Sequence, residues 1–352
     1  MFYKCRWQEH CYYEYLFNVY PLQHFMQWGT PEDVKEYNYW SQAFSNLVDL
    51  KGSPVAAPGS TVIPMAGLGQ RFANEGYAIT KPLISVSGSA MVVQAINDLP
   101  RTQNHIFVVR SDMPDYSEVI SELEDNYPNG LIKTIDHVTD GQACTAIIGV
   151  NALEDLNTQK PSPVTIGACD SGALYNNKDF VELLNDPEVD VIVWGVRGYP
   201  NAIRYPEMYG WIDSNNGVIR SVSVKKPLDN PVVDPIVLGT FTFKKIANFV
   251  SVTDSLMKRD GRVNGEFFMD SCVEDAIQLG LRCVLFEVDS YLCWGTPNDL
   301  KTFGYWQSCF HLWDGHSYQL QDDKRVSAEG VKILENFFIE KNPTKEFELG
   351  RQ

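Results

Sequence analysis

Two glycines, an arginine and a lysine form the first group of residues whose spacing indicates chemistry. The apolar run 62–65 leads into Ala66-Gly67-Leu68-Gly69, with Arg71 two residues after the second glycine and Lys81 ten residues later. Glycines at positive φ can turn successive backbone N–H groups toward an anion, and the two cations add mobile positive charge. The stretch is therefore a candidate phosphate site, although a glycine turn after a strand also occurs for purely structural reasons.

Two aspartates are candidate metal ligands. Asp170 closes an apolar strand, at the edge where a doubly wound sheet holds its ligands, and a carboxylate there suits Mg²⁺. Asp270 lies four residues after Glu266, which predicts that the two acids share one helix face. The structural alternatives are a loop cap at Asp170 and a solvated, acidic helix start at Glu266.

Small residues and an amide predict a surface that a flat ring can approach. Gly141-Gln142-Ala143-Cys144 opens an expected helix, and the Gln142 amide can both donate to and accept from a base edge. Lys225 and Lys226 end an expected strand, where they could meet a second phosphate. Exposed lysines at a strand end and small residues at a helix start are also common without a ligand.

The elements that must position these groups alternate along the chain from Thr61. The expected strands lie near 61–65, 105–110, 131–136, 163–168 and 190–196, and the expected helices between them lie near 90–98, 116–125, 142–154 and 177–184. Beyond Gly198 the pattern predicts strands near 209–213, 218–224, 236–243 and 282–288, and helices near 244–258, 266–279 and from Thr296. Such alternation predicts a parallel, doubly wound sheet with an antiparallel insertion facing the substrate. The charged stretch from Gln321 predicts one further strand and helix.

An internal repeat marks the region before this alternation. Trp28-Gly29-Thr30-Pro31, followed by Tyr39-Trp40 and Phe44, recurs as Trp294-Gly295-Thr296-Pro297, followed by Tyr305-Trp306 and Phe310. In each copy Thr-Pro before an acidic residue predicts a helix start. We interpret 1–50 as the C-terminal remnant of a preceding similar domain, 51–59 as a linker, 60–312 as the main domain and 313–352 as a C-terminal extension. Two helix starts that are alike by chance are the alternative.

The composition excludes several classes of protein. Of the 352 residues, 29 are Lys or Arg and 45 are Asp or Glu, which gives a net charge of −16 and no basic stripe for nucleic acid. No apolar run is long enough to span a membrane, and the first twenty residues lack the apolar segment of a signal peptide. The eight dispersed cysteines are typical of reduced thiols in a cytoplasmic protein.

In this order the motifs resemble those of the sugar-phosphate nucleotidyltransferases, also known as NDP-sugar pyrophosphorylases. The resemblance covers about residues 60–312 and rests on Pro64-Met65-Ala66-Gly67-Leu68-Gly69-Gln70-Arg71-Phe72, Lys81-Pro82, Asp170, Lys226-Pro227, Gly239-Thr240, Glu266 to Asp270 and Trp294-Gly295-Thr296-Pro297. Ala66 replaces the first of two adjacent glycines usual in that family, and Gln70 replaces its commoner Thr or Ser. The resemblance implies a Rossmann-like three-layer α/β/α nucleotidyltransferase fold, with a mixed, mostly parallel sheet and a small antiparallel insertion.

The same resemblance implies an activity and a set of roles. The activity is transfer of NMP from an NTP to a phosphorylated acceptor with release of pyrophosphate, in the synthesis of activated precursors for surface polysaccharide or glycoconjugates. A sugar 1-phosphate is the usual acceptor, and choline phosphate also occurs on this fold. The implied roles are catalysis by Arg71, Lys81 and Asp170; nucleotide binding by Ala66, Gly67, Leu68, Gly69, Gly141 and Gln142; acceptor binding by Lys226, Gly239, Thr240 and Glu266; and binding of Mg²⁺ or Mn²⁺ by Asp170 and Asp270.

Two alternatives stay open at this point. One is a metal-dependent nucleotide-sugar glycosyltransferase, and the other is a catalytically silent nucleotide-binding or regulatory module. A nicotinamide dehydrogenase is disfavoured, because Arg71 and Lys81 follow the glycine turn in place of a dinucleotide fingerprint. The expected partners are an NTP and a phosphorylated small molecule, with neither nucleic acid nor membrane, and a homo-oligomer is compatible with the sequence.

Overall fold

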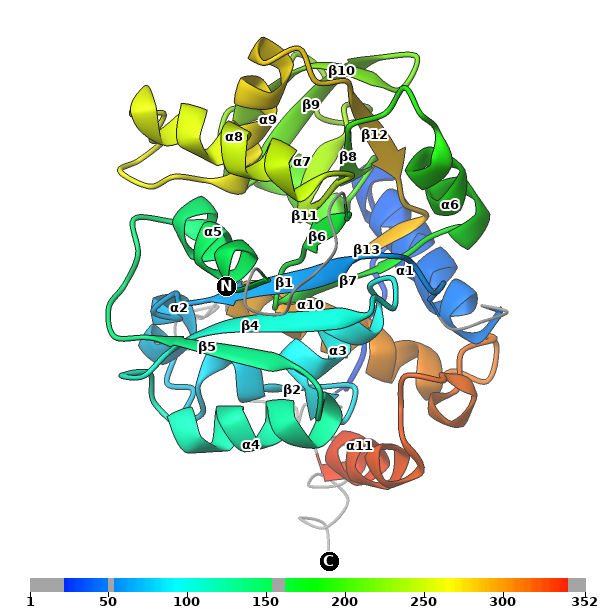
Figure 1. Cartoon of the computed structure of the whole chain (residues 1–352). Coiled ribbons are helices and arrows are strands. Elements are labelled where there is room, and N and C mark those ends of the chain that lie inside the picture. Colours follow the sequence, from blue (N-terminus) through cyan, green and yellow to red (C-terminus); the bar gives the residue numbers. More distant parts are fainter. Residues whose placement is uncertain (1–21, 50–53, 154–161, 341–352) are drawn as a thin grey trace, which may run out of the picture.

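Apolar strands form one large mixed sheet, and amphipathic helices pack on its faces (Figure 1). The computed structural model describes residues 22–49, 54–153 and 162–340. The strands are β1 (Ser60–Met65), β2 (Ser85–Val86), β3 (Ser89–Ala90), β4 (Asn104–Arg110), β5 (Leu131–Ile135), β6 (Val164–Ile166), β7 (Ser171–Leu174), β8 (Val191–Val196), β9 (Gly210–Asn215), β10 (Val218–Val224), β11 (Ile236–Phe243), β12 (Cys283–Glu287) and β13 (Ser290–Cys293). The α-helices are α1 (Pro31–Asp49), α2 (Gln70–Asn74), α3 (Met91–Asn97), α4 (Tyr116–Asn126), α5 (Gln142–Ala152), α6 (Asn177–Asn185), α7 (Pro200–Arg204), α8 (Ile246–Lys258), α9 (Met269–Gln278), α10 (Pro297–His311) and α11 (Ala328–Glu340).

The nine-stranded sheet has the order β5-β4-β1-β6-β11-β8-β12-β10-β9. Its first four strands are parallel, and β8 also pairs in parallel with β12. The pairings of β11 with β6 and β8, and of β10 with β9 and β12, are antiparallel. The fold is therefore mixed α/β as predicted, but parallel pairing dominates only one half of the sheet.

The strand order changes direction at β1, and this places the site. The chain runs outward from β1 to β4 and β5, then returns to form β6 on the other side of β1. Ligands of open α/β sheets bind at such a switch point, beyond the carboxyl ends of the strands. The glycine loop follows β1 and Asp170 follows β6, so the two candidate groups meet at the same edge.

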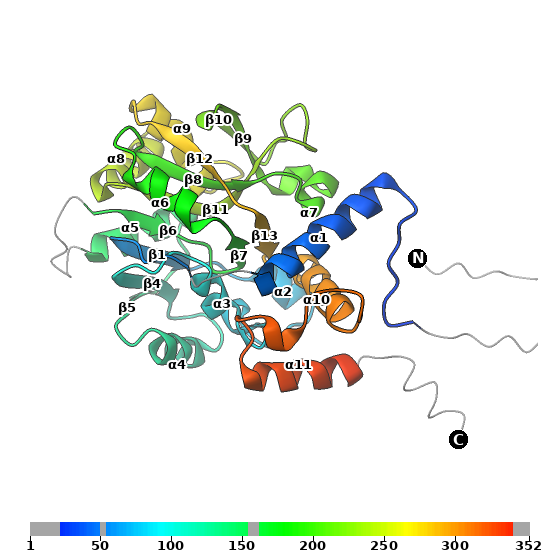
Figure 2. The ribbon, with the colours of Figure 1, turned by 90° about the vertical axis from the view of Figure 1, so that its right-hand side faces the viewer.

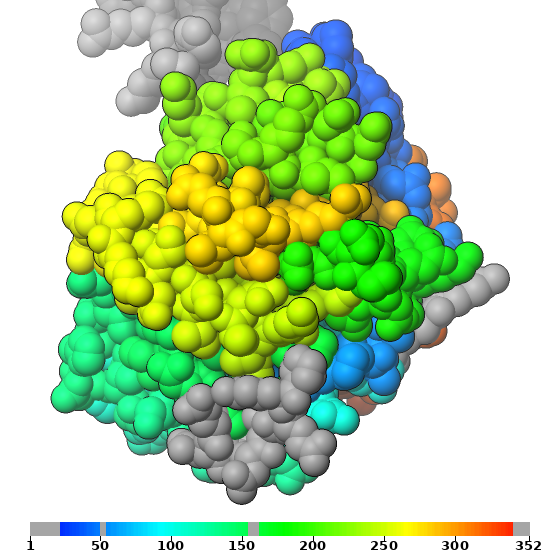
Figure 3. Space-filling view, turned by 45° about the horizontal axis from the view of Figure 1, so that its top comes forward, coloured from blue at the N-terminus to red at the C-terminus, as the bar shows by residue number. Residues whose placement is uncertain are grey.

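The buried side chains of β1 and β4 alternate between two apolar clusters, because successive strand residues point to opposite faces. Val62 and Ile106 pack with residues of α5, α8 and α9. Ile63 and Phe107 pack with residues of α3 and α4, on the other face. Figure 3 shows α8 and α9 residues, in yellow and gold, forming one continuous surface with the light green residues of β9 and β10.

A third apolar cluster joins the two copies of the repeat. Trp40 and Phe44 of α1 are buried against α10 and against the small antiparallel sheet formed by β7 and β13. Figure 2 shows α1 and α10 side by side at the edge of the molecule. Of the predicted linker, 54–59 is described and is packed, since Ala57 donates to the Arg101 carbonyl at 2.9 Å.

Most expected elements are present, with a few differences. Sequence patterns missed β7 and β13, which are four residues each and pair with one another across more than a hundred residues of chain. After Gln321 the structure has α11 but no strand within 321–340. The six cysteines in the described part of the chain are free thiols; four are buried, while Cys144 and Cys169 are partly exposed. No helix among the described residues is long and apolar enough to cross a membrane.

Candidate active site

The glycine loop is a tight turn that leads from β1 into α2. Gly69 has φ 63°, in the left-handed region that favours glycine, and its carbonyl accepts from the Phe72 amide at 3.0 Å to begin the helix. The nearly buried guanidinium of Arg110, at the end of β4, donates to the Ala66 carbonyl at 2.9 Å. Arg110, which the sequence analysis did not single out, therefore fixes the backbone of the loop at Ala66.

Lys81 and Asp170 form the charged centre of the site. The Lys81 Nζ lies 2.5 Å from the Asp170 Oδ2 and 3.1 Å from the Gly295 carbonyl oxygen, and it donates to both. Burial lowers the pKa of Lys81, but the carboxylate of Asp170 outweighs that effect, so the pKa stands above its ordinary value. The lysine is therefore positively charged at neutral pH and paired with the Asp170 carboxylate.

The Trp294-Gly295-Thr296-Pro297 turn positions this pair from the other side. The Trp294 amide donates to the Asp170 carbonyl at 2.9 Å, and the Thr296 side chain caps α10 by accepting from the Asp299 amide at 3.1 Å. A Cβ on Gly295 would lie 3.1 Å from the Asp170 Oδ2. The sequence analysis used this turn only as a family motif, yet its glycine contacts both charged residues.

Two cavities meet at the Lys81–Asp170 pair. The first, of about 520 Å³, is lined by the glycine loop and by the start of α5. The second, of about 610 Å³, extends toward β9, β11 and α9. Both cavities share Arg71, Lys81, Gln142, Ala168, Asp170 and Gly295. A ligand in the first cavity and a ligand in the second would therefore touch the same charged groups.

The first cavity contains all the residues expected to bind nucleotide. Its residues from this set are Ala66, Gly67, Leu68, Gly69, Gly141 and Gln142. Gly141 has φ 130°, and a Cβ there would lie 2.5 Å from the Phe267 backbone nitrogen, so only glycine fits the start of α5. The Gln142 side chain makes no hydrogen bond to the described residues, so its amide is available to a ligand in this cavity.

The acceptor residues expected from the sequence are only partly together. Gly239 lines the second cavity, whereas the buried Thr240 lines neither cavity and the exposed Glu266 lines the first. Lys226 is exposed and lies outside both cavities, while its neighbour Lys225 lines the second. Lys225 has φ 58°, and its Nζ lies 5.7 Å from the centre of the Phe268 ring. This left-handed turn aims the first lysine of the pair, not the second, into the cavity.

The prediction that Glu266 and Asp270 share a helix face is wrong. The helix α9 begins at Met269, and Glu266 lies before it in extended chain. A local turn and a long-range bond are the reason. The Glu266 and Val263 backbones bond to each other at 2.9 and 3.0 Å, and the Phe267 amide donates to the distant Asp140 carbonyl at 2.8 Å. These bonds hold the segment against the start of α5 and keep it out of the helix.

Asp270 nevertheless lies in the second cavity together with Asp170. Burial raises the pKa of Asp270 to about 6, although the nearby positive charge of Lys225 opposes the shift. Gly210 of β9 makes room for this carboxyl group, because a Cβ at that position would lie 2.2 Å from the Asp270 Oδ2. The partly buried Asp270 carboxyl group, which the resemblance implies as a metal ligand, therefore lies in the cavity that Asp170 also lines.

The two aspartates suit a hard divalent cation. Carboxylate oxygens are the ligands that Mg²⁺ prefers, and Mg²⁺ usually takes one or two of them together with substrate phosphates and water. The described residues contain no group of three or more His, Cys, Asp or Glu placed to hold a metal. Any cation at these two carboxylates would therefore need further ligands from outside the described residues.

A third cavity, of about 540 Å³, lies away from these groups. It is bounded by the turn between α3 and β4 and by the end of β7. None of the residues predicted to bind nucleotide, acceptor or metal lines it. Size alone therefore does not identify the site; the convergence of the glycine loop, the two aspartates and the partly buried Lys81 does.

The sequence matches no family model and no curated protein. Solved structures do match it. A nucleoside-diphosphate-sugar pyrophosphorylase from Vibrio cholerae is 17% identical, with a TM-score of 0.55 over 69% of this chain and 98% of that one. This chain has the sugar-phosphate nucleotidyltransferase fold. The fold is shared by an inositol-1-phosphate CTP transferase from T. maritima, at 12% identity, TM-score 0.51, and 73% and 98% coverage. A UTP-bound UGPase from Acinetobacter baumannii matches at 10% identity, TM-score 0.52, and 75% and 97% coverage.

Proposed function

We propose that the chain is a nucleotidyltransferase that transfers NMP from an NTP to a phosphorylated acceptor, with release of pyrophosphate. The observation that carries the proposal is the meeting of two cavities at one partly buried ion pair, Lys81 and Asp170. A group-transfer enzyme needs its two substrates to approach one reacting atom from different sides. The nucleotidyltransferase fold is consistent with two cavities that meet at one ion pair. We include the Rossmann-like three-layer arrangement of that fold in the proposal.

The chain's own residues would hold the NTP in the first cavity. The backbone amides of the glycine loop and the Arg71 guanidinium would bind the phosphates, and Gln142 would face the base. Lys81, which is charged and nearly buried, would neutralise the developing charge at the α-phosphorus. Asp170 and Asp270 would hold Mg²⁺, which supplies further charge neutralisation when bound.

The acceptor would enter the second cavity with its phosphate toward Arg71 and Lys81. A phosphate oxygen of the acceptor is already anionic at neutral pH, so it can attack the α-phosphorus without a general base. The bond to the β-phosphate oxygen breaks as the new bond forms, and pyrophosphate leaves on the side of the glycine loop. Lys225 and Gly239 lie on the wall beside the acceptor, and Lys225 replaces Lys226 in our assignment.

The decisive experiment measures pyrophosphate. The purified chain is incubated with Mg²⁺, each of CTP, UTP, GTP, ATP and dTTP, and a panel of sugar 1-phosphates and choline phosphate. We expect release of pyrophosphate that requires both an NTP and an acceptor, and its loss in Asp170→Asn with the fold retained. Failure of every combination would refute the proposal. In its specific form the proposal names a sugar 1-phosphate as the acceptor, which this panel tests, and places the product in polysaccharide or glycoconjugate synthesis.

A further inference from the structure

The two copies of the sequence repeat have the same local structure. Thr30 and Asp33 cap α1 with side-chain bonds of 2.8 and 3.2 Å, and Thr296 and Asp299 cap α10 with the same bonds at 2.6 and 3.1 Å. Each copy also places its tryptophan edge-on to the ring nine residues later. The ring centroids are 5.3 Å apart for Trp28 and Tyr37, and 5.7 Å apart for Trp294 and Phe303.

The two copies also pack on one another with two-fold symmetry. Equivalent positions differ by 266, as for Trp28 and Trp294. The ring centroids of Tyr37 and Trp306 are 6.1 Å apart. Replacing each residue by its equivalent in the other copy gives the pair Phe303 and Trp40, whose centroids are 6.3 Å apart. Phe44 and Phe310, which are equivalent to each other, meet at 5.6 Å. Contacts that recur with the partners exchanged define an isologous interface, so a local two-fold axis passes near these two phenylalanines.

Hydrogen bonds extend this symmetry beyond the helices. The Tyr39 hydroxyl donates to the Tyr291 carbonyl at 3.0 Å and accepts from its amide at 2.8 Å. The Tyr305 hydroxyl does the same with the backbone of Phe25, at 2.9 and 3.2 Å. Phe25 is the equivalent of Tyr291 in β13, so the segment 24–27 occupies the place of a second β13.

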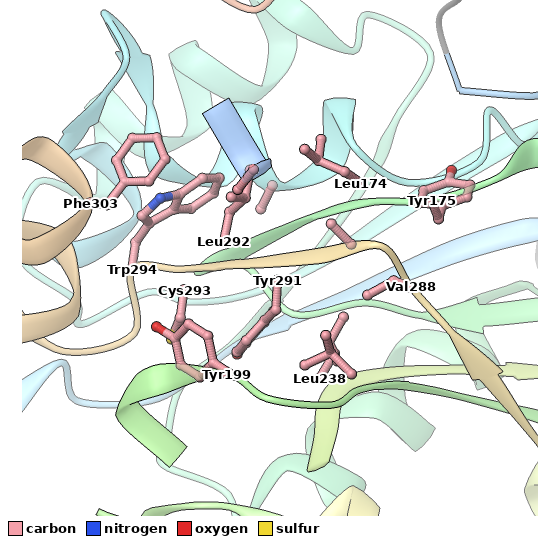
Figure 4. Close-up of a cluster of buried hydrophobic side chains, with 14 of the residues drawn as sticks. Leu174, Tyr175, Tyr199, Leu238, Val288, Tyr291, Leu292, Cys293, Trp294 and Phe303 are labelled. Atoms are coloured by element: carbon pink, nitrogen blue, oxygen red, sulfur yellow. The ribbon is translucent and has the colours of Figure 1, made fainter. Parts of the chain in front are cut away.

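The two segments differ in what covers them. In the second copy β13 pairs with β7, and its side chains alternate between Tyr199 and Leu238 on one side and Phe303 on the other (Figure 4). There Tyr291 is 6% exposed and Trp294 is fully buried, whereas their equivalents Phe25 and Trp28 are 71% and 54% exposed. No β7-like strand pairs with 24–27 among the described residues.

We propose that residues 22–49 are the closing strand and helix of a second nucleotidyltransferase domain. The body of that domain would lie on Phe25 and Trp28, with a β7-like strand beside 24–27, related to the described domain by the local two-fold axis. A second copy of this chain does not fit there, because its β7 is already paired with its own β13. The occupant we infer is therefore a domain body joined ahead of residue 22 in the same polypeptide.

The first test is the complete polypeptide as the source organism makes it. Gly69 lies 225 residues before Trp294, so we expect a second glycine-and-arginine loop about 225 residues ahead of Trp28. Affinity purification through the C-terminal end should give a polypeptide much heavier than 39.8 kDa. A polypeptide of 39.8 kDa without such a loop would overturn the inference.

The second test compares Phe25→Ser in this chain and in the complete polypeptide. Because the Phe25 side chain is mostly exposed here, we expect its replacement to leave Tm unchanged in this chain, and to lower Tm by at least about 4 °C in the complete polypeptide. Leu279→Ser, 49% exposed at the end of α9, is the control and should behave alike in both. Equal effects of Phe25→Ser in the two proteins would contradict the inference. Neither test measures turnover, so the outcome is independent of the pyrophosphate assay.

Discussion

If the proposed function is right, Gly210→Ala should strongly lower the nucleotidyltransferase activity without unfolding the protein. Gly210 has an ordinary negative φ, so alanine fits the backbone of β9. Its new methyl group would lie 2.2 Å from the Asp270 Oδ2 and 3.0 Å from the Asp270 Cγ, and Cβ atoms essentially never approach another heavy atom closer than 3.0 Å. The carboxyl group must therefore move by about 0.8 Å or more, whereas the strand that carries the methyl group need not move.

The size of the loss follows from that displacement. A misplacement of about 1 Å in a reacting assembly costs on the order of 10²-fold in rate. We therefore expect Gly210→Ala to lower the rate of pyrophosphate release about 100-fold, with a change in Tm of less than about 2 °C. Gly304→Ala is the matched control, since a Cβ there has no neighbour within 4 Å; it should retain full activity and gain slightly in stability.

A double-mutant cycle separates this mechanism from a general effect on β9. In Asp270→Ala the carboxyl group is absent, so adding Gly210→Ala should cause no further loss of rate. Steady-state pyrophosphate assays on the four proteins, at saturating NTP and acceptor, measure the coupling. Full activity of Gly210→Ala, or an equal additional loss in the Asp270→Ala background, would refute the steric reasoning.

Three further predictions concern the partly buried Lys81, the buried Asp98 and the repeat helices. Lys81→Met should lower kcat by at least about 100-fold with an unchanged far-UV spectrum, because it removes the partly buried positive charge beside Asp170; near-normal kcat would exclude this role. Burial raises the pKa of Asp98 to about 6, so the stability that this proton contributes is complete below pH 3.8 and is lost as the pH rises through 6. In urea titrations Asp98→Asn should therefore gain about 3 kcal/mol relative to the parent between pH 3.8 and neutrality, and a pH-independent difference would contradict the assignment. Phe44→Ala should lower the free energy of unfolding by about 3–5 kcal/mol in the same titration, because this ring is fully buried between α1 and α10; a loss under 1 kcal/mol would show that the contact contributes little.

The sequence predicted best the features that depend on short stretches of chain. The turn at Gly69 and the position of Asp170 follow from a strand and the loop directly after it, and the structure brings both to the edge where the strand order reverses. The start of α5 at Gln142 is local in the same way. These groups were therefore predictable without knowledge of any tertiary contact.

The features that the sequence missed depend on contacts between distant segments or on an unusual backbone conformation. Glu266 lies at a spacing that suits a helix, but the bond from Phe267 to Asp140 takes the segment out of α9. The choice between Lys225 and Lys226 depends on one residue adopting φ 58°, which composition does not predict for a lysine. The roles of Gly210 and Gly295 are visible only when the side chains of the two aspartates are in place.

The repeat connects the active site to the architecture. In the second copy the Gly295 carbonyl accepts from Lys81, and the Trp294 amide holds the backbone of Asp170. The first copy has the same capped helix and the same two-fold contacts, but its Gly29 faces no lysine among the described residues. If a second domain body lies on this segment, the equivalence of positions predicts that its own lysine donates to the Gly29 carbonyl. Each closing segment would then contribute to a reacting centre on its own side of the axis, and the aromatic contacts around Phe44 and Phe310 would fix the distance between the two sites.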